Sequence, residues 1–104
     1  MRSKHRTDAN HAEIISAFES LGCSVVDLSA TAGAAVRNIG VADLLVGIAG
    51  VNELVENKTE DGKLSMSQLA FNERWRGAPA HKVASVNDVI DLVQSVRKKI
   101  KNGG

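Results

Sequence analysis

Two carboxylates and a lysine occupy positions at which a β-hairpin would place them on one face. Two apolar runs of strand length, 43–48 and 51–58, are separated by an Ala-Gly pair, which predicts a hairpin with a two-residue turn. Counting outward from that turn sets Asp43 opposite Glu56, and Lys58 points to the same face because side chains alternate along a strand. Directly opposed Cβ atoms lie about 4.5–5.5 Å apart, so two like charges there repel each other unless something positive lies between them. A divalent cation is the natural candidate.

The length and composition of the chain indicate one small domain. A chain of 104 residues can form one modest core, so we expect a single domain over 1–104. The chain has a single cysteine, Cys23, so it cannot form an internal disulfide. A single cysteine also argues against a zinc site and predicts a cytoplasmic protein. No apolar run reaches the roughly 20 residues that a membrane span needs, so we expect no membrane partner. The basic start of the chain lacks the apolar stretch of a signal peptide.

Positive charge gathers at the two ends of the chain although the net charge is only +1. The near-neutral total argues against indiscriminate binding to nucleic acid, but clustered cations can contact phosphates. We therefore interpret the segments 1–7 and 97–104 as basic tails, and solvated, frayed ends are the alternative. The candidate DNA contacts in these tails are Arg2, Lys4, Arg6, Lys98 and Lys99.

The hairpin is expected to lie within an α/β fold. An apolar stripe predicts a first helix, a Val-rich run predicts a first strand, and Ser-x-x-Gln and Ser-x-x-Asp patterns predict the starts of two later helices. The order is α-β-β-β-α-β-α, with a mixed central sheet flanked by helices. Outside the hairpin, the predicted segments are helix 8–21, strand 23–28, loop 29–40, helix 65–75, strand 80–84 and a last helix from 85.

The motif and the element order together resemble the PD-(D/E)xK nuclease superfamily and its restriction-endonuclease-like core. Within it, the chain most closely resembles the small VRR-NUC domains, many of them phage-encoded, and the related archaeal-type Holliday junction resolvases. The resemblance covers about residues 8–95. Glu-x-Lys alone is a weak signal, but it is more specific after Asp and a hairpin. The segments that carry the resemblance are Gly-Val-Ala-Asp-Leu-Leu-Val-Gly at 40–47, Leu-Val-Glu-Asn-Lys at 54–58, Ser65-x-x-Gln68 and Trp75.

Two residues depart from the family pattern. The motif's proline is Ala42 here, and because that proline shapes the backbone and supplies no ligand, its loss leaves the proposed chemistry intact. The residue between the glutamate and the lysine is usually apolar, but it is Asn57 here. A polar side chain is unusual in a central strand.

The resemblance implies a metal site for phosphodiester hydrolysis. Asp43, Glu56 and the backbone carbonyl of Asn57 would hold Mg²⁺ or Mn²⁺, which takes oxygen ligands and activates water. Lys58 would orient the attacking water or stabilise the transition state. The alternative for these side chains is a surface hairpin with an ordinary cross-strand ion pair, which leaves two opposed carboxylates unexplained.

The resemblance also implies roles for residues outside the hairpin. Related resolvases carry a glutamate on the first helix that reaches the metal, and Glu13 falls at that position, although an exposed helical glutamate is the alternative. Gln68 matches a residue near the active site of VRR-NUC domains, where it could position the lysine or the water. The capping box with Ser65 explains Gln68 equally well. Arg37 is the candidate phosphate contact of the loop before the hairpin.

The expected function is therefore a metal-dependent DNA endonuclease that acts on branched or structured DNA such as four-way junctions. So small a chain has little room for a base-reading element, which favours recognition of shape and phosphates. Symmetric junction cutting needs two active sites and predicts a homodimer. Alternatives are a flap or nicking nuclease that acts as a monomer, a catalytically silent DNA-binding scaffold, and an unrelated interaction module. A phage-encoded protein would act in the host cytoplasm.

Overall fold

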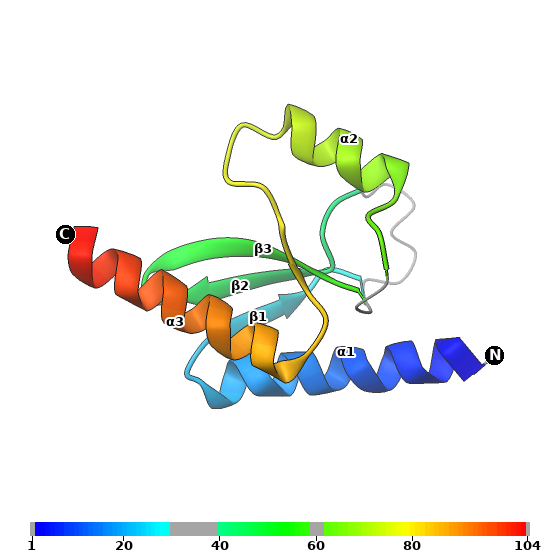
Figure 1. The fold of residues 1–104 in the computed structure, drawn as a ribbon, viewed down its shortest axis with the longest axis horizontal. Coiled ribbons are helices and arrows are strands. Elements are labelled where there is room, and N and C mark those ends of the chain that lie inside the picture. The colour runs from blue at the N-terminus through cyan, green and yellow to red at the C-terminus, as the bar shows by residue number, and fades with distance from the viewer. Residues whose placement is uncertain (1, 30–39, 59–61, 104) are drawn as a thin grey trace.

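The predicted order of helices and strands is confirmed in a computed structural model that describes residues 2–29, 40–58 and 62–103, with side chains from residue 10 onward (Figure 1). A helix precedes three consecutive strands, and a second helix leads to the last strand and the last helix. The elements are α1 (Arg2–Ser20), β1 (Ser24–Asp27), β2 (Leu44–Ile48), β3 (Val51–Asn57), α2 (Met66–Arg74), β4 (His81–Val83) and α3 (Val86–Gly103).

The hairpin has the register that the sequence predicts. Ile48 pairs with Val51 across the turn, and Ala49 and Gly50 have φ values of 51° and 88°. Positive φ at both central residues is the mark of a type I′ turn, whose twist matches that of the two strands. The described strands form one sheet in the order β1-β2-β3-β4, antiparallel except for the parallel pair β3 and β4, so the sheet is mixed.

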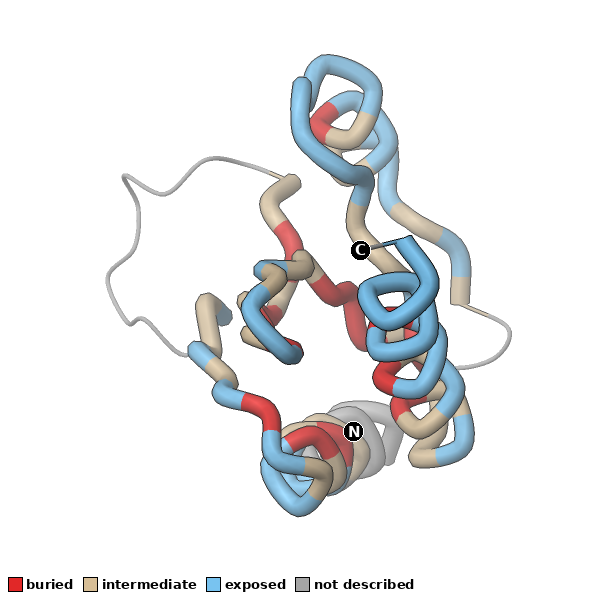
Figure 2. The backbone as a smooth tube through the Cα atoms, turned by 90° about the vertical axis from the view of Figure 1, so that its left-hand side faces the viewer, coloured by how far each residue is buried: buried red, intermediate tan, exposed pale blue. Residues whose placement is uncertain are grey.

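The core lies between one face of the sheet and the two long helices. Alternate residues of β2 (Leu44, Val46 and Ile48) are fully buried, whereas their neighbours are half-buried. Figure 2 shows the buried segments of α1 and α3 turned toward the sheet. The apolar side chains of these two helices and of the sheet form one cluster, which includes Ile14, Phe18, Val55, Val83, Val89, Val93 and Val96.

Helix α1 begins earlier than the sequence pattern indicates, and α3 includes most of the C-terminal basic segment. Helix α1 begins at Arg2, not near residue 8, and α3 continues to Gly103, so most of each predicted basic tail is helical. No proline and no glycine interrupts either stretch before its last residue, so nothing in the local sequence ends the helix earlier. In the described part of the chain, no helix is long and apolar enough to cross a membrane.

Helix α2 lies apart from α1 and α3, above the sheet in Figure 1. Of its residues only Phe71 is buried, and Trp75 at its C-terminal end stacks on that ring with the centroids 5.2 Å apart. The first turn of α2 packs closely against Gly40, which has a φ of 91°. The Cα of Gly40 lies next to the backbone of Ser67 and Gln68. A Cβ at Gly40 would collide with the carbonyl of Ser67. The absence of a side chain at this position therefore allows α2 to approach the start of β2.

Candidate active site

The two carboxylates meet at the end of the hairpin farthest from its turn. The last β2–β3 pair is Leu44 with Val55, so one further step in the register sets Asp43 opposite Glu56. The backbone N–H of Asn57 donates to Oδ2 of Asp43 at 3.1 Å, and the Asp43 carbonyl accepts from the N–H of Leu28 at 2.8 Å. Asp43 is thereby fixed on both sides, by β3 through its carboxylate and by the end of β1 through its backbone.

Glu56 is buried beside Asp43, with only 3% of its surface exposed. Burial, the negative charge of Asp43 and a side-chain hydrogen bond with Asp43 together raise the pKa of Glu56 to about 7. The charge of Lys58 and the hydrogen bond from Gln68 act in the opposite direction and compensate only in part. The site therefore contains more negative charge than its own side chains neutralise.

Lys58 is the cation of this group. It follows β3 directly, its N–H donates to the carbonyl of Val83 at 2.9 Å, and its Nζ lies 3.8 Å from Oε2 of Glu56. The ammonium group thus lies on the same side of the strand as Glu56, as the alternation of side chains predicts. At 3.8 Å its attraction is weaker than that of a hydrogen-bonded ion pair, and its side chain keeps 27% of its surface exposed.

Gln68 joins α2 to this group. Its Oε1 accepts from the N–H of Ser65 at 2.8 Å, and its own N–H donates to Oγ of Ser65 at 3.2 Å, which confirms the predicted capping box. The same side chain donates from Nε2 to Oε2 of Glu56 at 2.5 Å. The two alternatives for Gln68 are compatible, since one amide oxygen caps the helix while the amide nitrogen contacts the carboxylate.

The side chain of Asn57 points away from Glu56, toward α1. It is buried, with 9% of its surface exposed, and its Oδ1 accepts from Nδ2 of Asn10 at 3.1 Å. Its Nδ2 lies 3.4 Å from Nδ1 of His11. These partners explain how a polar residue is accommodated at a strand position that is usually apolar, because a buried amide needs hydrogen bonds.

A second polar group continues from His11. Its Nε2 lies 2.9 Å from Oδ2 of Asp27, the last residue of β1, and Ser29 donates to Oδ1 of Asp27 from its hydroxyl at 2.7 Å and from its N–H at 3.0 Å. Burial raises the pKa of Asp27, but the hydrogen bonds of Ser29 and His11 and the charge of His11 outweigh this and lower it.

Ser29, His11 and Asp27 are the residue types of a hydrolase triad but lack its geometry. The Ser29 hydroxyl and the Asp27 carboxylate both contact Nε2 of the imidazole, whereas a triad places them on opposite nitrogens. The sequence analysis did not identify this group, because it assigned no role to His11. A signal was present, since His11 lies three and seven residues before Ile14 and Phe18 and so shares their apolar stripe.

The structure does not join Glu13 to the two carboxylates. Helix α1 turns Asn10 and His11 toward the sheet, whereas Glu13 is exposed. Among the hydrogen bonds and ion pairs of the described residues, none links Glu13 to Asp43 or Glu56. Its role as a metal ligand therefore stays a prediction.

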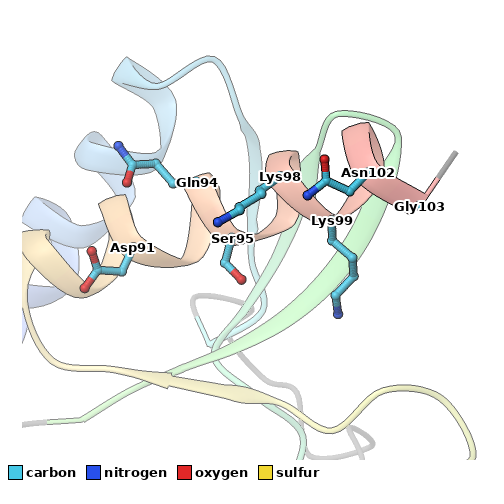
Figure 3. A pocket seen from close by; sticks show the side chains of 7 residues that line it. All are labelled: Asp91, Gln94, Ser95, Lys98, Lys99, Asn102 and Gly103. Carbon is cyan, nitrogen blue, oxygen red and sulfur yellow. The ribbon is translucent and has the colours of Figure 1, made fainter.

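The predicted DNA contacts lie in separate places. Arg2, Lys4 and Arg6 belong to the first turns of α1, whose side chains are not described, and Arg37 lies outside the described residues. Lys98 and Lys99 are exposed on α3 and line a shallow groove with Asp91, Gln94 and Asn102 (Figure 3). All the residues that line the groove belong to α3, so it is a feature of the outer face of that helix.

The donors gathered around Asp43 suit a hard divalent cation. Mg²⁺ binds one or two carboxylates and retains several waters, so Asp43 and Glu56 meet its needs without a third acidic side chain. The described residues contain no group of three or more His, Cys, Asp or Glu side chains at ligand distance, so a site that requires such a set has no support here. The excess negative charge at Glu56 is the physical reason why a cation would bind.

Comparison with known proteins identifies one informative relative. No family model matches the sequence, and no curated protein matches it. Among solved structures, a chain described as "VRR_NUC domain" is 31% identical and superposes with a TM-score of 0.64. The alignment covers 85% of this chain and 94% of that one, so the likeness extends over nearly the whole domain.

Proposed function

Because the chain belongs to the VRR-NUC family, we propose that it is a metal-dependent DNA endonuclease that hydrolyses phosphodiester bonds in branched or structured DNA, as a Holliday junction resolvase does. The observation that carries this proposal is the pairing of Asp43 with a buried Glu56 of raised pKa, next to the ammonium group of Lys58. An interaction module has no need of two carboxylates held against each other, whereas phosphodiester hydrolysis needs both cation ligands and a positive group near the phosphate.

Each side chain of the group has a distinct task in this proposal. Asp43, Glu56 and the main-chain carbonyl of Asn57 would hold Mg²⁺ or Mn²⁺, which supplies Lewis-acid polarisation of the phosphate and activation of water. Lys58 stabilises the negative charge that grows on the phosphate during the reaction. Gln68 fixes the orientation of the Glu56 carboxylate through its hydrogen bond.

The preference for branched DNA rests on the size of the domain and on symmetry. The described elements are all used to build the sheet, its helical cover and the site, which leaves no additional helix or ribbon for reading bases in a groove. Recognition by shape and phosphates is the remaining mode. Since two strands of a four-way junction must be cut symmetrically, we propose that the protein acts on junctions as a homodimer.

We also propose that the protein works in the cytoplasm. Its lone Cys23 is buried in the core and burial raises the pKa of its thiol, as is typical of an unreactive structural cysteine in a reducing compartment.

A cleavage assay with matched variants tests the proposed function. The protein is incubated with labelled four-way junction, flap, splayed, duplex and single-stranded DNA in Mg²⁺, Mn²⁺ or EDTA. We expect cleavage only with a metal, and loss of cleavage in Glu56→Gln. Glu53→Gln is the control on the same strand, because Glu53 pairs with His81 at 3.0 Å and lies on the other face.

The outcomes separate the candidate functions. Paired symmetric nicks in the junction, with a dimeric mass by light scattering, would support a resolvase. Cutting of flaps or single strands by a monomer would favour the flap or nicking nuclease. Binding of DNA without cutting in any metal would favour the silent scaffold, and neither binding nor cutting would contradict the nuclease function.

A further inference from the structure

Asn57 connects the proposed metal site with α1. Its backbone N–H holds the Asp43 carboxylate at 3.1 Å, and the residues on either side of it are Glu56 and Lys58. Its side chain projects to the opposite face, where it meets Asn10 and His11 of α1 at 3.1 and 3.4 Å. One residue therefore carries contacts to both faces of the strand.

The hydrogen-bond roles in this contact are determined by the donors and acceptors. The Asn10 amide donates to Oδ1 of Asn57, so the Asn57 amide nitrogen is the group that faces His11. That nitrogen can only donate, which makes Nδ1 of His11 the acceptor and places the imidazole proton on Nε2. The Nε2–H then donates to Asp27 at 2.9 Å. Each group in this chain of contacts is satisfied when the imidazole is neutral.

We propose that Asn10 and His11 are positioning residues for the metal site, which act by holding the side chain of Asn57 and thereby the peptide between Glu56 and Lys58. This inference rests on the proposed function. An apolar residue at position 57 would pack against α1 without a preferred orientation about its bonds. The two hydrogen bonds instead fix the Asn57 amide relative to a rigid helix, and with it the N–H that holds Asp43 and the carbonyl proposed as a ligand.

The inference gives α1 a connection to the site that does not depend on Glu13. Partners of groups that bind a metal orient those groups, and their loss typically weakens metal affinity about 10–100-fold. Asn10 and His11 act here through the backbone of Asn57, so the lower end of that range is expected. His11 is held in turn by Asp27, which Ser29 orients, so the contact reaches the end of β1.

The test compares variants of His11 that keep different bonds. His11→Asn retains an acceptor near the position of Nδ1 and loses the contact with Asp27, whereas His11→Gln retains the Asp27 contact and loses the acceptor for Asn57. Asn10→Ala removes the other bond to Asn57. The matched control is His81→Ala, which removes a histidine–carboxylate contact of 3.0 Å at Glu53, away from Asn57.

Two measurements do not depend on DNA cleavage. Titration of Mn²⁺ by calorimetry should give a dissociation constant about tenfold weaker in His11→Gln and Asn10→Ala than in the wild type, with His11→Asn close to the wild type. Amide exchange by NMR in EDTA should accelerate at Asn57 relative to Val55 in the same two variants. In cleavage, the Mg²⁺ concentration for half-maximal rate should rise while the rate at saturating Mg²⁺ and the KM for DNA change little.

The results distinguish this inference from the proposed function. If the wild type binds Mn²⁺ and His11→Gln and Asn10→Ala bind it equally well, the positioning role is wrong and the nuclease stands. An effect of His81→Ala as large as theirs would also overturn it, since a general loss of stability would then explain all three. If the wild type neither binds Mn²⁺ nor cuts DNA, both the nuclease function and the positioning role are wrong. In that case, faster amide exchange at Asn57 in His11→Gln and Asn10→Ala would still show that these residues hold Asn57 against α1.

Discussion

Glu56 is the residue whose ionisation the fold opposes most clearly. Its carboxyl group is buried next to Asp43, and the Lys58 ammonium at 3.8 Å with the amide of Gln68 only partly offsets the repulsion. A proton and a divalent cation are alternative ways to relieve that repulsion. Protonation would therefore compete with cation binding at the same carboxylate, and the pH dependence of stability should reveal this in the absence of metal.

Raising the pH from 5 to 8 should destabilise the metal-free protein through Glu56. The pKa of Glu56 is about 7 in the folded protein, against an ordinary value of 4.5 for the unfolded chain. The stabilisation is complete below pH 4.5 and is lost as the pH rises through 7, because the unfolded chain releases the proton more readily. The difference of the two pKa values corresponds to about 3 kcal/mol. Urea unfolding in EDTA at a series of pH values measures the free energy of unfolding.

Glu56→Gln is the control for this pH dependence. Glutamine has nearly the same shape and cannot ionise, so the difference in unfolding free energy between the two proteins isolates Glu56 from the histidines and the other carboxylates. The variant should be the more stable protein at pH 8, although it cannot hold the metal. A difference that stays constant from pH 5 to 8 would show that the pKa of Glu56 is not raised.

At the scale of elements, three segments that are distant in sequence converge on this carboxylate. The end of β3 carries Glu56, the residue before β2 is Asp43, and the first turn of α2 supplies Gln68. Because α2 has only one buried residue, its position depends on its start: the capping box and the contact with Gly40. The stability of that first turn and the geometry of the site are therefore coupled, and variants can separate the two.

Ser65→Ala and Gln68→Ala should separate the helix cap from the contact with Glu56. Both remove part of the capping box, so each should lower stability by about 1 kcal/mol. Only Gln68→Ala removes the donor to Glu56 at 2.5 Å. We expect the cleavage rate to fall about tenfold in Gln68→Ala, because the Glu56 carboxylate loses the hydrogen bond that orients it. The rate should stay near that of the wild type in Ser65→Ala. Equal losses of cleavage in the two variants would mean that Gln68 acts only through the helix.

Gly40→Ala and Gly50→Ala should separate backbone strain from a steric collision. Both glycines have positive φ, 91° and 88°, so alanine at either costs about 1–2 kcal/mol for the left-handed conformation. At Gly50 the added Cβ meets nothing within 4 Å, whereas at Gly40 it collides with the backbone of Ser67. Thermal unfolding should therefore show the larger loss in Gly40→Ala, and cleavage should fall in that variant alone. Similar cleavage rates in the two variants would contradict the conclusion that the contact with Gly40 positions α2.

Local rules of the sequence account for much of this arrangement. An Ala-Gly pair between two apolar runs was enough to predict the register that brings Asp43 opposite Glu56, because side-chain alternation and a two-residue turn leave one solution. Ser65 and Gln68 likewise predicted a helix start that the capping box confirms. These features depend only on residues close together in the chain.

Contacts between distant elements were not predictable in the same way. Asn57 looked like a departure from the family pattern, and only the packing of α1 on the sheet reveals Asn10 and His11 as its partners. The same packing exposes Glu13, although its position beside an apolar stripe is equally consistent with a residue that faces the sheet. The rotation of a helix about its axis is set by all of its core contacts together, so a single polar position at the border of the stripe stays ambiguous.

At the scale of the whole molecule, the two basic segments lie toward opposite ends. The first turns of α1 extend beyond the sheet at the end where β2 begins and β3 finishes, and the last turns of α3 lie toward the hairpin turn (Figure 1). The longest dimension of the molecule is 43 Å. A phosphate bound near Asp43 therefore lies toward the same end of the molecule as the start of α1, whereas Lys98 and Lys99 lie toward the other end and would meet DNA farther along or on a different arm.

Neutralising the two ends should therefore affect DNA binding differently. Replacement of Arg2, Lys4 and Arg6 by glutamine should weaken binding to every DNA, and the slope of log K against log salt should become shallower by about 3, since each of the three lost phosphate contacts contributes about 0.9. Replacement of Lys98 and Lys99 should leave a short duplex unaffected and weaken the four-way junction, whose arms extend to both ends of the protein. Fluorescence anisotropy in Ca²⁺ over a range of salt concentrations would measure binding without the expected cleavage. If instead the lysine variant lost affinity for the short duplex while the α1 variant kept it, the DNA path would run along α3, and the site at Asp43 would lie outside it.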